Sequence, residues 1–167
     1  MILSCARQQR VKLMANVYTN ATSGEVSVVA TTAKTVLQIK APTNQRILIW
    51  EVLVEGKAAA GGTDTPMKVR LTRSTANFGS AASSLSTYSK NNPSDSETLQ
   101  ATVTSNFNVE PTSPSDGGLW LEVQPQLSQA FIYSPTRPIV IPGGQSAQFE
   151  VTAPANQTVV ITLRCEE

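Results

Sequence analysis

Short runs of apolar residues, separated by turns that contain glycine and proline, restrict this chain to β structure. The runs are rich in β-branched residues, and several alternate with polar ones, which is typical of strands. The strongest run, RILIWEVLVE at 46–55, is apolar over nearly its whole length and predicts a central strand covered on both faces. No run has the 3.6-residue period and caps of an amphipathic helix. The other predicted strands lie at 25–30, 35–40, 68–72, 97–104, 119–123, 130–133, 138–141, 147–152 and 158–164.

The number and spacing of these runs indicate one all-β domain. About 8–10 short antiparallel strands with turns such as NNPS, PSDGG and IPGG predict a sandwich or a closed barrel. The 167 residues fit a single domain, and only 15% of them are charged, fewer than solvated helices usually carry. We expect the sandwich at residues 24–167, after a flexible or extended N-terminal arm at residues 1–23. Because Met14 begins the segment MANVYTN, residues 1–13 are either an upstream extension or part of that arm.

The segment PIVIPGGQSAQFEV at 138–151 contains a pair of glycines that could form either a ligand-binding loop or a turn between strands. No lysine follows Gly143 and Gly144, and no helix begins after them, so they lack the pattern of a phosphate-binding loop. Glycine pairs between strands supply the backbone angles of a turn. We therefore predict a strand, a corner and a second strand, with Phe149 and Val151 in the core.

The residue types present exclude most catalytic designs. The chain has no histidine and only two cysteines, Cys5 and Cys165, so the usual triads and zinc sites cannot form. A pair of carboxylates could still hydrolyse a glycosidic bond, and Glu51, Glu122 and Glu150 are the candidates for that alternative. Glutamates on the wet face of a sheet are far commoner. We therefore expect no enzymatic activity, no cofactor and no metal.

The distribution of charge argues against nucleic acid as a partner. Subtracting Arg7, Arg10 and Lys12 from the 13 basic residues leaves ten, against 12 acidic ones, so residues 14–167 carry a net charge of −2. Phosphate binding requires clustered lysine and arginine, which this part of the chain lacks. No stretch approaches the ~20 apolar residues of a membrane-spanning helix, so we expect no membrane partner either.

Seven of the nine aromatic residues fall into two groups. Four of them occur inside apolar runs and are predicted to pack in the core. Three others occur in long connections at 75–96 and 105–118, where they could anchor a partner protein. The core group is Trp50, Trp120, Phe131 and Phe149, and the loop group is Phe78, Tyr88 and Phe107.

The segments KTVLQIKAPTNQRI at 34–47 and IPGGQSAQFEVTAPANQTVVITLRCEE at 141–167 resemble those of a known family. From Met14 to the C-terminus the chain is similar to small decoration, or cement, proteins of tailed-bacteriophage heads. The resemblance implies a jelly-roll-like β-sandwich that binds the major capsid protein, often as a homotrimer. It also implies a location on the outer surface of the virion capsid, after synthesis in the host cytoplasm.

Two functional hypotheses follow from these features. The first is a non-enzymatic capsid-binding protein that makes contact through the segment 15–24, which holds Tyr18 and Asn20, and through the two long connections. The second is a carbohydrate- or receptor-binding module, for which Phe78, Tyr88 and Phe107 would form an aromatic platform. Both hypotheses place binding on Tyr18, Asn20, Phe78, Tyr88 and Phe107 or on a subset of them.

Overall fold

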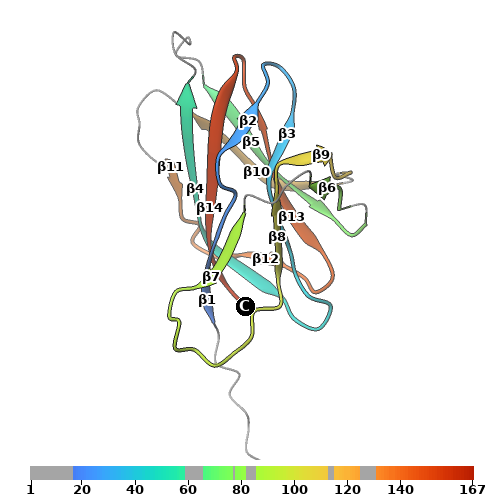
Figure 1. Ribbon diagram of the computed structural model, residues 1–167, viewed down its shortest axis with the longest axis vertical. Helices are drawn as coiled ribbons and strands as arrows, with labels where there is room; N and C mark the ends of the chain where they lie inside the picture. Colours follow the sequence, from blue (N-terminus) through green and yellow to red (C-terminus); the bar gives the residue numbers. More distant parts are fainter. Residues whose placement is uncertain (1–16, 59–65, 77, 82–85, 113–114, 125–130) are drawn as a thin grey trace, which may run out of the picture.

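The chain folds into two antiparallel β-sheets that pack face to face, as seen in a computed structural model (Figure 1). The structure describes residues 17–58, 66–76, 78–81, 86–112, 115–124 and 131–167, and this part of the chain contains no helix. It therefore contains no helix that could cross a membrane. The predicted all-β sandwich is confirmed.

The larger sheet has seven strands. Its main path is β11 (Phe131–Tyr133), β4 (Ile47–Ala58), β14 (Gln157–Glu166), β1 (Tyr18–Thr22) and β7 (Thr87–Lys90). Two short strands join this path, because β12 (Ile139–Ile141) also pairs with β4 and β2 (Val26–Val28) with β14.

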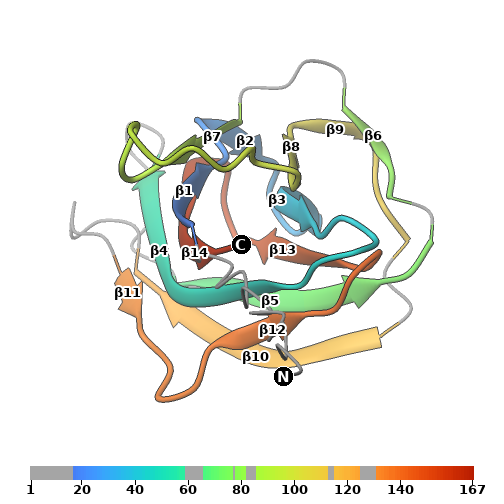
Figure 2. The same ribbon diagram turned by 90° about the horizontal axis from the view of Figure 1, so that it is seen from below.

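The smaller sheet has five strands in the order β10 (Ser115–Val123), β5 (Met67–Ser74), β13 (Ser146–Thr152), β3 (Lys34–Lys40) and β8 (Thr102–Ser105). A separate two-stranded sheet, β6 (Ser80–Ala81) with β9 (Phe107–Val109), lies on the β3 side of this sheet (Figure 2). The chain alternates between the two large sheets from β3 to β5 and again from β12 to β14. Strands distant in sequence therefore become neighbours within each sheet.

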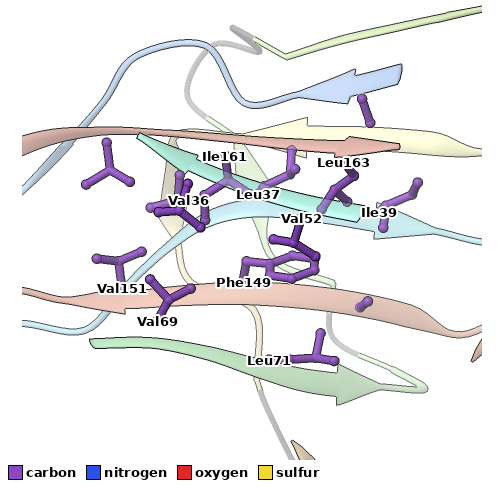
Figure 3. Packing of buried hydrophobic residues seen from close by; sticks show 14 of the residues in the cluster. Val36, Leu37, Ile39, Val52, Val69, Leu71, Phe149, Val151, Ile161 and Leu163 are labelled. Atoms are coloured by element: carbon purple, nitrogen blue, oxygen red, sulfur yellow. The ribbon is translucent and has the colours of Figure 1, made fainter. Parts of the chain in front are cut away.

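Side chains from both large sheets meet in one apolar core (Figure 3). Alternation along β13 and β14 brings Phe149, Val151, Ile161 and Leu163 into this core, each 0% exposed. Phe149 lies centrally between the sheets in Figure 3, as its position in the sequence predicts. Burial of such side chains contributes roughly 1.5–3 kcal/mol each, which makes this core the main source of stability.

Each predicted strand has a counterpart, although the one predicted at 97–104 runs only from Thr102 to Ser105, and four short strands, β1, β6, β7 and β9, were not predicted from the sequence. Part of the predicted N-terminal arm is one of these. Residues 18–22 form β1, which lies inside the larger sheet between β14 and β7. Thr19 and Ala21 point inward and are 0% exposed. Because these side chains are small or polar, the buried strand has no apolar pattern in the sequence. Residues 1–16 of the predicted arm lie outside the described residues.

The predicted corner at Gly143 and Gly144 is a turn that joins β12 to β13. Gly144 has a φ of 77° and donates its N–H to the carbonyl oxygen of Pro42 at 3.0 Å. A Cβ on Gly143 would lie 2.6 Å from the carbonyl oxygen of Thr43. The glycines therefore allow the turn to pack against the β3–β4 connection, and the interpretation of a structural corner is confirmed.

The two-stranded sheet is held against β3 by polar contacts from residues near its strands. Glu110 forms an ion pair with Lys34 at 2.9 Å and accepts the backbone N–H of Thr35 at 2.9 Å. Lys34 also donates to the carbonyl oxygen of Phe107. At the other end of β3, the ammonium of Lys40 lies 3.9 Å from the ring centroid of Phe78. Both predicted loop aromatics in this region are therefore engaged within the fold.

Candidate functional site

A β-bulge in β4 directs Trp50 to the outer surface of the larger sheet. Glu51 pairs with Arg164 of β14 and Ile49 pairs with Cys165, so Trp50 is the extra residue between two consecutive pairs. Bulges of this kind redirect a side chain and break the alternation of the strand. Trp50 is 39% exposed, whereas Ile49 and Val52 on either side of the bulge are 0% exposed.

Three of the four aromatic residues predicted for the core lie at the surface instead. Trp50, Trp120 and Phe131 are 39%, 56% and 38% exposed, and only Phe149 is buried. Phe131 lies on the short strand β11, and Trp120 lies on β10 at the end of the smaller sheet. The prediction was wrong because a position inside an apolar strand was taken to indicate the core, and the strand of Trp50 was also taken to be covered on both faces. Strand β4 is in fact covered on one face, and its other face carries half-buried or exposed side chains.

The indole of Trp50 is fixed by a buried carboxylate. Its Nε1–H donates to Oε2 of Glu166 at 2.8 Å. Glu166 lies on β14 directly between Leu48 of β4 and Tyr18 of β1, and it is only 6% exposed. A buried carboxylate requires a hydrogen-bond donor, and a bond to a charged group contributes roughly 1.5–3 kcal/mol. The indole N–H of Trp50 therefore has its hydrogen-bond acceptor within the protein, while part of the ring remains exposed.

Aliphatic side chains adjoin this tryptophan on the same face of the sheet. Leu48 and Leu53 of β4 are half-buried. Val140 pairs with Leu48 and Ile132 pairs with Leu53, and these two are 39% and 57% exposed. Tyr18, 54% exposed, lies beyond Glu166. We call the set Tyr18, Leu48, Trp50, Leu53, Ile132 and Val140 the Trp50 face.

Polar residues border the Trp50 face on the side of β14 and β1. Arg164 forms an ion pair with Glu51 at 3.2 Å. Asn20 of β1 pairs in register with Arg164, and its side chain hydrogen-bonds to Asn91. An apolar centre with an aromatic anchor and a polar border is the arrangement found in protein–protein interfaces. Of the predicted site residues, Tyr18 thus lies on this face and Asn20 at its border.

The other predicted site residues do not join them. Phe107 is 2% exposed, Phe78 is half-buried beside Lys40, and Tyr88 is half-buried on β7. The structure therefore gives these three aromatics no common exposed surface. The residue that sequence reasoning missed is Trp50. In the sequence, an aromatic residue next to a glutamate in a long apolar strand is only a weak signal of a bulge. The bulge is determined by the register in which β4 pairs with β14.

Tyr88 has a structural role at one end of the sandwich. Its hydroxyl accepts a hydrogen bond from Thr19 Oγ1 at 3.2 Å and donates to Glu167 Oε2 at 2.7 Å. Burial raises the pKa of Tyr88 far above its usual value, and its hydrogen bond to Glu167 raises it further. The other carboxylate oxygen of Glu167 accepts the backbone N–H groups of Gln100 and Ala101 at 2.7 and 3.1 Å. This network joins the end of β14 to β1, to β7 and to the segment before β8.

The carboxylates considered for glycoside hydrolysis are divided between the two outer surfaces. Glu51 lies on the outer face of the larger sheet, where it pairs with Arg164. Glu150 of β13 pairs with Arg70 at 3.4 Å on the outer face of the smaller sheet, and Glu122 lies on that same sheet. The apolar core separates Glu51 from the other two. Among the described residues no three Cys, Asp or Glu side chains gather as a metal site.

Cys165 is a free thiol within the described residues, and it is buried in the core. Burial raises the pKa of Cys165 to about 12, with a further contribution from the charge of Glu167. The thiol is therefore protonated at neutral pH and lacks the character of a nucleophile.

Comparison with known proteins gives no relative from which to transfer a function. The chain matches no protein-family model, and no curated protein or solved structure is significantly similar to it. Its surfaces are therefore interpreted from their own residues.

Proposed function

We propose that this chain is a non-enzymatic β-sandwich that acts by binding another protein through the Trp50 face. One observation carries the proposal: Trp50 is held by Glu166, yet it remains partly exposed among aliphatic side chains. Tryptophan, tyrosine and arginine are the residue types most enriched at binding hot spots. The Trp50 face and its border hold Trp50, Tyr18 and Arg164.

The fixed position of the indole also favours binding. An interface that must order a mobile side chain loses roughly 0.5–1.5 kcal/mol of affinity for each one. Trp50 is already held in place by the 2.8 Å hydrogen bond to Glu166. A partner that covers the indole therefore gains its apolar contact with little loss of entropy.

The resemblance to tailed-phage head proteins suggests what the partner is. We propose that it is the major capsid protein and that the chain decorates the outer surface of a capsid as a homotrimer. A rigid sandwich with one anchored aromatic face suits a structural role, and two of the three candidate glutamates, Glu51 and Glu150, are each held in an ion pair with an arginine. Light scattering on the purified chain should give a mass of three chains. The mass of a monomer would contradict the homotrimer but not the proposed binding to the capsid protein.

Cosedimentation of the purified chain with empty head shells tests the proposed partner. Wild type should sediment with the shells, and Trp50→Ala should lose most of that binding. Trp120→Ala is the matched control, because Trp120 is exposed on the other sheet. Failure of wild type to bind would contradict the capsid assignment. Equal binding by wild type and Trp50→Ala would contradict the role of the Trp50 face.

A further inference from the structure

A second exposed tryptophan, Trp120, lies on the outer face of the smaller sheet. It belongs to β10, an end strand of that sheet, and it is 56% exposed. Its surroundings differ from those of Trp50. Trp120 pairs in register with Arg70 of β5, and Arg70 pairs with Glu150 of β13, so the three occupy one row across three strands.

Contacts within this row support the indole from one side. The guanidinium carbon of Arg70 lies 5.4 Å from the ring centroid of Trp120, within the range of a cation–π interaction. Arg70 Nε also lies 3.4 Å from Glu150 Oε2. The aromatic ring and the ion pair therefore form one connected group, with the Arg70 side chain 35% exposed and the Glu150 side chain 18% exposed.

The neighbouring row adds two more charged groups. Glu122 of β10 pairs with Lys68 of β5, and Lys68 pairs with Thr152 of β13. Both Glu122 and Lys68 are exposed. We call the set Trp120, Arg70, Glu150, Glu122 and Lys68 the Trp120 face. Its two positive and two negative side chains give it a net charge of zero.

The chemistry of the Trp120 face selects against two classes of ligand. A nucleic acid or another polyanion requires an excess of positive charge, which this face lacks. The centre of a protein–protein interface is depleted in charged residues, whereas here every near neighbour of the indole in the two rows except Thr152 is charged. A neutral ligand with both an apolar surface and many hydroxyl groups fits these constraints.

We propose that the Trp120 face binds a neutral oligosaccharide. The C–H face of a pyranose ring packs on the indole, whose exposed surface is apolar. Sugar hydroxyls donate to the carboxylates of Glu150 and Glu122 and accept from Arg70 and Lys68, and hydrogen bonds to charged groups are the stronger kind. Adjacent strands lie about 4.8 Å apart, so neighbouring groups can reach hydroxyls on one sugar or on two linked sugars.

An array of immobilised neutral glycans, probed with the full chain, tests the proposal. Isothermal titration with the corresponding free oligosaccharide then shows whether the sugar alone is sufficient for binding. Wild type should bind at least one neutral glycan in both formats. Trp120→Ala should weaken that binding at least about tenfold, while Val29→Ala, a control at an exposed apolar position outside both faces, should leave it unchanged. Trp120→Phe should retain part of the affinity, because it keeps an aromatic face.

Several results would overturn the proposal. These are the absence of any neutral glycan bound by wild type, binding unaffected by Trp120→Ala, and binding lost equally in Val29→Ala. Binding restricted to sulfated or sialylated glycans and abolished by salt would overturn the neutral class of ligand. Circular dichroism of each variant confirms that the sandwich is intact. The Trp120 face and the Trp50 face lie on different sheets, so these results are independent of those with head shells.

Discussion

Trp50 of β4 and Glu166 of β14 form a hydrogen bond at 2.8 Å between an indole N–H and a buried carboxylate. The bond joins the two most extensively paired strands of the larger sheet at the position of the β4 bulge. It therefore links a local irregularity of the backbone to the orientation of the tryptophan on that surface.

Trp50→Phe should destabilise the fold, because it removes the N–H donor and leaves the carboxylate of Glu166 buried without it. We expect a loss of about 1–3 kcal/mol in the free energy of unfolding. Urea titration followed by far-UV circular dichroism measures this loss. Glu166→Gln serves as the milder comparison, since it keeps an acceptor oxygen at the same position. A Trp50→Phe variant as stable as wild type would show that the bond contributes nothing.

Gly143→Ala should cost more stability than Gly144→Ala, although only Gly144 has a positive φ. A Cβ on Gly143 would meet backbone atoms of Thr43 and Pro42 at 2.6–3.1 Å, so one chain segment must move. At Gly144 the new Cβ would meet only the Thr43 methyl at 3.7 Å, and the cost is the left-handed backbone, about 1–2 kcal/mol. Thermal unfolding of both variants gives the order, and a larger loss for Gly144→Ala would contradict it.

The sequence predicts the β-sandwich well, because most strands carry their own apolar pattern. The pattern of β13 predicted that Phe149 and Val151 lie in the core, and both are 0% exposed. Strand β1 could not be found in this way, since its inward residues are Thr19 and Ala21. Thr19 is buried because its hydroxyl donates to Tyr88, which lies 69 residues away in the chain.

The candidate site was harder to predict than the fold for a related reason. Whether Trp50 or Trp120 is buried depends on what covers the outer face of each sheet, and hydropathy carries no information about that. The bulge at Trp50 is set by the register between β4 and β14, and these strands are far apart in sequence. Conversely, Thr72 and Gln148 are polar but fully buried, because they lie opposite each other on adjacent strands, where their side chains share a hydrogen bond.

Glu110→Gln should loosen the two-stranded sheet without unfolding the sandwich. Glu110 holds this sheet through its ion pair with Lys34 and its bond to the Thr35 N–H. The glutamate side chain is 40% exposed, so we expect at most about 1 kcal/mol of global destabilisation. Hydrogen exchange should become faster at residues 106–110 and stay unchanged in β13 and β14. Glu97→Gln, an exposed position, is the control, and equal exchange in both variants would contradict the prediction.

Alkaline solution should destabilise the fold through Tyr88 and Cys165. Burial raises the pKa of both groups above their ordinary values of 10.0 and 9.0, so the unfolded chain loses these protons at a lower pH than the folded one. Their contribution to stability is therefore intact below pH 9 and is lost as the pH rises, by up to about 1.4 kcal/mol per pH unit for each group. Urea titrations between pH 8 and pH 11 measure the slope. Tyr88→Phe lowers stability at every pH because it removes the bond to Glu167, but it should also make the decline above pH 10 less steep. A slope unchanged by Tyr88→Phe would show that the phenol titrates alike in the folded and unfolded chain.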